Sequence, residues 1–144
     1  AQTGVLIGYP VIDLCVQILD GSHHPVDSSE MAFRIAASMA FKDAARKAGL
    51  ILLEPVMKVE ITTPDDHMGE VIGDLTSRRG QIRELESSCH ESSRLLAHTP
   101  LAELFGYATA LRSLSRGRAS YSMEPSHFEP VPASIQTQLV EMKA

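Results

Sequence analysis

The sequence is short of several features that mark common classes of protein. It has no tryptophan and only two cysteines, Cys15 and Cys89, which show neither a C-x-x-C spacing nor a Cys/His ligand pattern. A disulfide scaffold and a zinc site are therefore disfavoured, and we expect two free thiols in a reducing compartment. No apolar run approaches bilayer length, and no signal-peptide pattern opens the chain. These absences favour a soluble, cytoplasmic protein.

Motifs that bind phosphate or carry catalysis are also missing. The chain contains no G-x-x-x-x-G-K-[ST] phosphate loop, no G-x-S-x-G nucleophile motif and no H-E-x-x-H metal motif. We therefore expect this stretch of chain to be no enzyme by itself, with no catalytic residues, metal or cofactor of its own.

The charge balance is acidic, with a formal net charge of -5 over 144 residues. A free-standing, sequence-independent nucleic-acid binder usually has a basic surface, so this class is disfavoured. Contact with RNA through a few local arginines is still compatible with the composition. The chain also starts without methionine on a strand-like run, which suggests a fragment.

Residues 11–19 predict a strand, and a helix is expected to begin near Asp27 or Ser28 and to run through Lys47. One side of the strand is wholly apolar, and the helix is apolar almost all the way round between Met31 and Phe41. One strand and one helix cannot cover such faces, because independent stability usually needs three or more paired strands. We therefore expect a partial βα unit, the remnant of a split β-α-β domain with its other part upstream.

The second half predicts a complete domain. The expected elements are a strand at 56–62, a helix from 64 to 80, strands at 81–86 and 94–98, and a helix and strand within 100–123. This βαββαβ order predicts an α+β, ferredoxin-like sandwich. Gly69 and Gly73 predict close packing of the first helix on a neighbouring element. The last strand is expected either to end near Glu124, before Pro125, or to run on along a sheet edge.

The predicted domains are therefore 1–50, 51–130 and a tail at 131–144, in which residues 135–142 predict a helix. Three arginines, Arg112, Arg116 and Arg118, gather where the helix within 100–123 ends. Cations suit a helix C-terminus, and the same residues could hold a phosphate-bearing partner. Spacing alone does not separate a capped, solvated helix end from a phosphate site.

Two adjacent histidines, His23 and His24, lie in the loop before the first helix. Side chains of neighbouring residues in an extended segment point apart, and no third ligand is near in sequence, so a metal site is disfavoured. Solvated loop histidines are the simplest interpretation.

Long ordered segments of the chain resemble elongation factor G, a translational GTPase. They are DGSHHPVDSSEMAF from residue 20, LEPVMKVEITTP from residue 53, GEVIGDLTSRRG from residue 69, and PLAELFGYAT and LRSLSRGRASY from residues 100 and 111. The resemblance covers about residues 4–132 and implies the second half of the fourth domain followed by the fifth. It implies that GTP and Mg belong to an upstream domain, and that the partners are the ribosome, with its rRNA and proteins, and tRNA and mRNA.

The resemblance also implies roles for particular residues. His24, with His23 and Ser22, would form the tip that enters the decoding site beside tRNA and mRNA. The rRNA contacts near the sarcin-ricin loop would come from Arg112, Arg116 and Arg118, and more weakly from Arg78 and Arg79. The implied function is displacement of tRNA and mRNA, driven by GTP hydrolysis in the upstream domain.

Other functions stay open at this point. A recycling-specialised paralogue and a ribosomal protection protein share the family's pattern, although the intact run from Asp27 to Phe33 beside His24 favours the translocase. A stand-alone ferredoxin-like ligand-binding regulator would require a complete first domain and a pocket at a dimer interface. An acylphosphatase-like hydrolase would require an arginine in a phosphate-cradling loop at the first strand, and residues 50–55 contain none.

Overall fold

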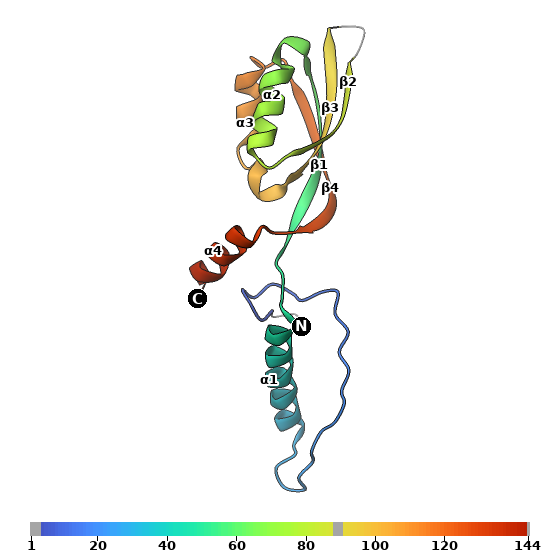
Figure 1. The fold of residues 1–144 in the computed structure, drawn as a ribbon, viewed down its shortest axis with the longest axis vertical. Coiled ribbons are helices and arrows are strands. Elements are labelled where there is room, and N and C mark those ends of the chain that lie inside the picture. Colours follow the sequence, from blue (N-terminus) through green and yellow to red (C-terminus); the bar gives the residue numbers. More distant parts are fainter. Residues whose placement is uncertain (1–3, 88–90, 144) are drawn as a thin grey trace. The chain divides into compact units, whose positions relative to one another are not determined.

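The computed structural model describes residues 4–87 and 91–143 (Figure 1). By internal contacts the chain divides into two compact units. The first unit comprises the residues up to Leu52 together with those from Pro132 onward, and the second unit is Leu53–Val131. Cys89 lies outside the described residues, whereas Cys15 is an exposed free thiol.

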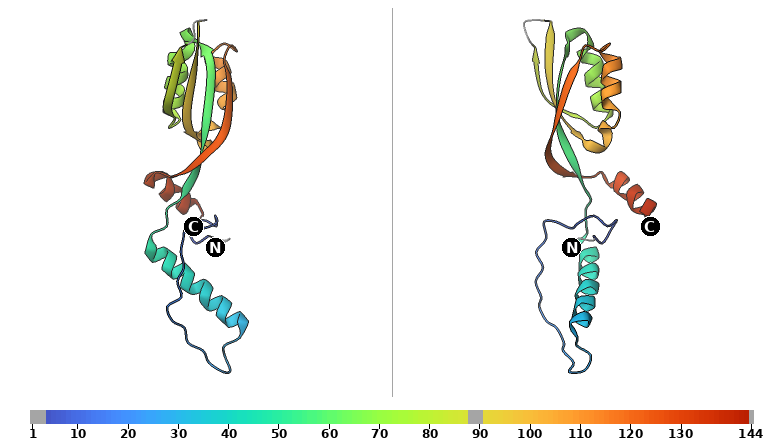
Figure 2. Two further views of the ribbon diagram at one scale, coloured as in Figure 1. Left: turned by 90° about the vertical axis from the view of Figure 1, so that its right-hand side faces the viewer. Right: turned by 180° about the vertical axis from the view of Figure 1, so that it is seen from behind.

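The second unit is an antiparallel four-stranded sheet with the order β2-β3-β1-β4 and two helices on one face (Figures 1 and 2). Its elements are β1 (Leu53–Pro64), α2 (Asp65–Ser77), β2 (Gln81–Ser87), β3 (Ser92–Pro100), η1 (Leu101–Leu104), α3 (Tyr107–Leu114) and β4 (Ser120–Pro130). This is the predicted βαββαβ sandwich.

The core of the second unit lies between the sheet and the two helices. Alternate residues of β1 and β3 point toward the helices, and their side chains interlock with the apolar stripes of α2 and α3. The fully buried members include Val59, Ile61, Leu95, Val71, Leu75 and Leu111. Burying each such side chain contributes about 1.5–3 kcal/mol, so the strand alternation and the helical stripe together define the fold.

The helix expected within 100–123 is interrupted, which corrects the prediction of one continuous helix. A 3-10 turn ends at Leu104, and α3 begins at Tyr107 after Gly106, whose φ is 73°. Only glycine adopts this left-handed conformation freely. The break lets Leu104 and Tyr107 both enter the core, where they are 8% and 1% exposed.

The last strand continues past Pro125 to Pro130, which settles the alternative in favour of an edge strand. β4 is an outer strand of the sheet, where a missing backbone N–H can face solvent. Its register with β1 shifts between the pairs Val56–His127 and Met57–Pro125, which leaves Ser126 as a bulge.

The expectation for Gly69 and Gly73 is wrong. Both lie on the exposed side of α2, and a Cβ atom added to either meets no described atom within 4 Å. The glycine that is closely approached is Gly80, where an added Cβ would lie 2.6 Å from the carbonyl oxygen of Leu75. Gly80 also donates its N–H to that oxygen at 2.8 Å, which closes the turn after α2.

The first unit contains α1 (Glu30–Ala48) and α4 (Ala133–Lys143). Helix α1 begins two to three residues later than predicted, because Ser29 is the N-cap and its Oγ accepts the N–H of Ala32 at 3.1 Å. Gln136 of α4 accepts the N–H of Leu52 at 2.9 Å and donates to the carbonyl of Leu50 at 3.4 Å.

The strand predicted at 11–19 is not formed, and this expectation is corrected. Residues 4–29 contain no strand, and none of the described strands includes them as a sheet neighbour. The apolar side that the sequence defines is exposed, with Ile12 at 54%, Val16 at 63% and Ile18 at 87%. A strand needs a hydrogen-bonding neighbour, so the β-type pattern alone does not produce one here.

Candidate nucleic-acid interface

The chain leaves α3 through a tight left-handed turn. Arg116 and Gly117 have φ values of 51° and 77°, and the N–H of Gly117 bonds to the carbonyl of Arg112 at 2.8 Å. A left-handed residue after the last helical turn redirects the backbone, as at many helix C-termini. The turn thereby brings Arg112, Arg116 and Arg118 to the same end of the helix.

A buried serine anchors this turn. Ser115 is fully buried, its Oγ donates to the carbonyl of Leu111 at 2.7 Å, and it accepts the N–H of Ala119 at 3.1 Å. The hydroxyl therefore joins the last turn of α3 to the start of β4. Sequence reasoning missed Ser115, because serine at the end of a helix is common and its partners are visible only in three dimensions.

Arg112 in the last turn of α3, and Arg116 and Arg118 after it, are exposed and keep their charge available. Neither Arg112 nor Arg116 forms an ion pair with any residue that the structure describes. The guanidinium of Arg118 contacts the imidazole of His67 and, among the described residues, no carboxylate. Guanidinium groups present several N–H donors in a planar fork, which suits the oxygen atoms of phosphate.

Arg78 follows the last turn of α2, and its side chain is held by contacts within the second unit. Its Nε donates to Asp74 at 2.8 Å, its Nη1 donates to the carbonyl of Glu103 at 2.8 Å, and its guanidinium stands 5.3 Å from the ring centre of Tyr107. Burial raises the pKa of the Tyr107 hydroxyl, so the ring remains neutral. Arg78 joins the end of α2 to the turn before α3.

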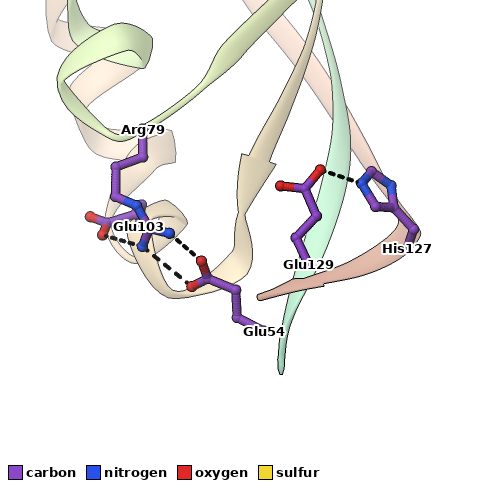
Figure 3. A network of polar contacts seen from close by, with 5 residues as sticks. All are labelled: Glu54, Arg79, Glu103, His127 and Glu129. Carbon is purple, nitrogen blue, oxygen red and sulfur yellow. Dashed lines mark hydrogen bonds and ion pairs between the residues drawn. The ribbon is translucent and has the colours of Figure 1, made fainter. Parts of the chain in front are cut away.

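Arg79 forms a second network at that end of the helices (Figure 3). Both of its terminal nitrogens reach the carboxylate of Glu54, and Nη1 also lies 3.4 Å from Glu103. The hydrogen bond to Glu54 is the main cause of the raised pKa of Arg79. Arg79 has a φ of 61° at the turn after α2, so its backbone is held in a conformation that non-glycine residues adopt rarely.

The five arginines named by the sequence therefore lie in two places. Arg118 contacts the first turn of α2 through His67, whereas Arg78 and Arg79 follow its last turn and pair with acidic groups. Only the group of Arg112, Arg116 and Arg118, called here the α3 arginine group, combines proximity with unpaired charge.

The loop before α1 places its two histidines apart. The backbone N–H of His24 donates to Ser28 Oγ at 2.6 Å, and its Nδ1 lies 3.5 Å from Asp27, with 68% of the His24 side chain exposed. His23 stacks instead on Phe33 of α1, with 6.3 Å between ring centres. Ser22, His23 and His24 are all exposed, and the Nδ1 atom of His24 also accepts the N–H of Val26 at 3.5 Å.

The outer face of the sheet carries a small cluster of polar side chains. His127 Nε2 lies 2.6 Å from Glu129 (Figure 3), and its ring meets that of His98 edge-on with 5.3 Å between centres. Arg83 donates to His98 Nδ1 at 3.2 Å. Across residues 4–87 and 91–143, no group of three or more His, Cys, Asp or Glu residues could hold a metal ion, and no helix could span a membrane.

Comparison with known proteins gives both units a family. Residues 1–49 match the family described as elongation factor G, domain IV, and residues 51–139 match the family described as elongation factor G C-terminus. These matches define the chain as two consecutive domains from the C-terminal region of a translation factor. The chain belongs to the elongation factor G family.

Individual relatives agree with this family. The chain is 56% identical over 140 residues to elongation factor G of Petrotoga mobilis, covering 96% of this chain and 20% of the relative. It is also similar to a crystal structure of a Thermus thermophilus protein, with a TM-score of 0.84 and 39% identity over 99% of this chain and 22% of that one. The chain thus spans about a fifth of the length of these two proteins.

Proposed function

We propose that this chain is the ribosome-contacting C-terminal portion of an elongation factor G, and that it promotes movement of tRNA and mRNA on the ribosome. GTP hydrolysis, with GTP and Mg, would be supplied by another domain of the full-length protein. The observation that carries the proposal is the α3 arginine group, whose charges are not neutralised by described acidic residues. Membership of the elongation factor G family supports the choice of the ribosome as partner.

The α3 arginine group is proposed to contact phosphates of large-subunit rRNA near the sarcin-ricin loop. Each guanidinium can donate two parallel hydrogen bonds to phosphate oxygens. Because the chain as a whole is acidic, long-range attraction to RNA is weak and the contact depends on this local group. Such a contact suits a factor that must also dissociate from the ribosome in each cycle.

The loop around His24 is proposed to act at the decoding site. Its imidazole is exposed, and it can donate hydrogen bonds to phosphate or ribose and stack on a base. The hydrogen bond from the His24 N–H to Ser28 and the return bond from the Ser28 N–H to the His24 carbonyl give the loop a defined shape. His23, held against Phe33, would support this loop from the side of α1.

The experiment uses a chimera in which this segment replaces its equivalent in an active elongation factor G. Arg116→Glu should lower ribosome-stimulated GTP turnover, and Arg116→Asn should lower it less, because asparagine tolerates the left-handed backbone and only removes the charge. Arg83→Glu on β2 is the matched control, since it makes the same charge change on another surface. Equal turnover in all variants at several salt concentrations would refute the assignment.

Single-turnover translocation separates the translocase from its relatives. His24→Ala should slow movement of tRNA and mRNA while GTP hydrolysis continues, and His127→Ala should leave movement unchanged. GTP hydrolysis without movement, but with subunit splitting on addition of a recycling factor, would identify a recycling paralogue instead. Displacement of a bound antibiotic without translocation would identify a ribosomal protection protein.

A further inference from the structure

We infer that His67 is a positioning residue for Arg118, holding its guanidinium ready for a phosphate of the RNA partner without neutralising it. The inference rests on the proposed function of the α3 arginine group. His67 is one of the few buried polar residues of the second unit.

The contact joins two segments that are far apart in the chain. His67 lies in the first turn of α2 and is 9% exposed, while Arg118 follows α3 by four residues. His67 Nε2 and Arg118 Nη2 are 2.7 Å apart. A guanidinium can only donate hydrogen bonds, so Nε2 must accept, and the ring is the neutral tautomer with its proton on Nδ1.

Arg118 differs from Arg78 and Arg79 because its hydrogen-bond acceptor is an uncharged ring. Arg78 and Arg79 pair with carboxylates, which would compete with an incoming phosphate. Arg118 is ordered by a ring without charge, although Asp65 and Asp66 lie in the same turn as His67.

Asp65 is engaged elsewhere, because it accepts the hydroxyl of Ser93 at 2.5 Å, and no described acidic group forms an ion pair with Arg118. The remaining N–H donors of the Arg118 guanidinium, beyond the one that contacts His67, stay available to an external anion. A side chain held in place before binding loses less conformational freedom when it binds, which favours affinity. The backbone supports the same geometry, since the N–H of Arg118 bonds to the carbonyl of Ser115 at 3.0 Å.

The test compares His67→Leu, which removes the acceptor, with His67→Gln, whose amide oxygen can replace it. In the full-length chimera, His67→Leu should raise the ribosome concentration for half-maximal GTP turnover by about two- to tenfold, as expected for one hydrogen bond, with kcat unchanged. His67→Gln should restore most of this loss. In an Arg118→Ala background, His67→Leu should have no further effect.

Nitrogen NMR of the 144-residue chain provides the second measurement. The His67 ring should show the Nδ1-protonated tautomer, and the Arg118 Nε–H signal should change from restricted to mobile in His67→Leu. Additive effects of the two substitutions, the other tautomer, or an unchanged Arg118 signal would each overturn the inference. If the NMR coupling is present but Arg118→Ala and Arg116→Glu leave turnover unchanged, the failure lies in the proposed RNA contact.

Discussion

Arg79 and Glu54, which are 25 residues apart in sequence, form a bidentate ion pair (Figure 3). The pair joins the turn after α2 to the beginning of β1. The Glu54 side chain is only 11% exposed, so the pair is partly shielded from water. The pair accounts for why Arg79, one of the arginines suggested by the sequence, serves the fold.

The first prediction follows from this pair. Arg79→Asn removes the ion pair while tolerating the left-handed backbone, and it should lower the free energy of unfolding by about 1.5–3 kcal/mol, the range for hydrogen bonds to charged groups. Arg112→Ala, at an exposed arginine without a described ion pair, should change it by less than about 0.5 kcal/mol. Urea denaturation of the two variants makes the comparison, and equal losses would contradict the structural role of Arg79.

The second prediction concerns the glycines of α2 and its terminal turn. Gly80→Ala should destabilise the second unit by about 1–3 kcal/mol, because the new Cβ would meet the backbone oxygen of Leu75 and force the turn to shift. Gly69→Ala and Gly73→Ala should each stabilise it by about 0.5–1 kcal/mol, since alanine favours the helix and meets no described atom. Thermal unfolding measures all three, and a destabilising Gly73→Ala would show that α2 needs the glycine for another reason.

The third prediction is a pH dependence from His98. Burial is the main cause of the lowered pKa of His98. The charges of Arg83, His127 and Lys58 lower this pKa further, and the charge of Glu129 raises it. The unfolded imidazole, with a pKa of about 6.5, therefore binds its proton at higher pH than the folded one. The stability contributed by neutral His98 is present above that value and is lost as the pH falls through the lower folded pKa.

The measurement is the urea midpoint between about pH 7 and pH 5, where imidazole titrates. His98→Gln should flatten the loss of stability on acidification. A His98→Gln chain with the original slope would assign the pH dependence to other groups.

The fourth prediction contrasts the two units. Ala45 is the one buried residue of α1, whereas β1 and β3 contribute Val59, Ile61 and Leu95, which are fully buried. Backbone amides of α1 should therefore exchange with solvent through local opening at low free energy, and those of β1 and β3 only through global unfolding of their unit. Hydrogen exchange followed by mass spectrometry measures this, and equal protection of α1 and β1 would contradict it.

The second unit was largely predictable from the sequence because its elements have clear periodicity. The helical stripe of α2 and the alternation of β1 are repeated locally, and both became buried faces. The break at Gly106 was not predicted, because apolar residues at helical spacing continue across it and the left-handed φ depends on how Leu104 and Tyr107 enter the core. The strand predicted at 11–19 is absent for the opposite reason. Its local pattern is clear, but no described strand pairs with it.

The site was predictable only as a set of residue types. The sequence shows that five arginines lie at the ends of two helices, but it does not show which of them contact carboxylates. Arg79 contacts Glu54, 25 residues away in sequence, and Arg118 contacts His67, 51 residues away. No local sequence pattern predicts contacts over such separations. Their roles as rRNA contacts, and that of His24 as a tip residue, stay predictions for the chimera experiments.

The proline and bulge in β4 also govern how copies of the second unit could associate. Pro125 offers no backbone N–H, and the bulge at Ser126 interrupts the regular spacing of the outer edge, so a neighbouring molecule cannot continue the sheet there with an unbroken ladder. Regular sheet extension between molecules is therefore favoured at β2, the opposite edge. A contact that uses one edge of each molecule ends at a pair, so the interrupted β4 edge disfavours open-ended polymerisation of the unit.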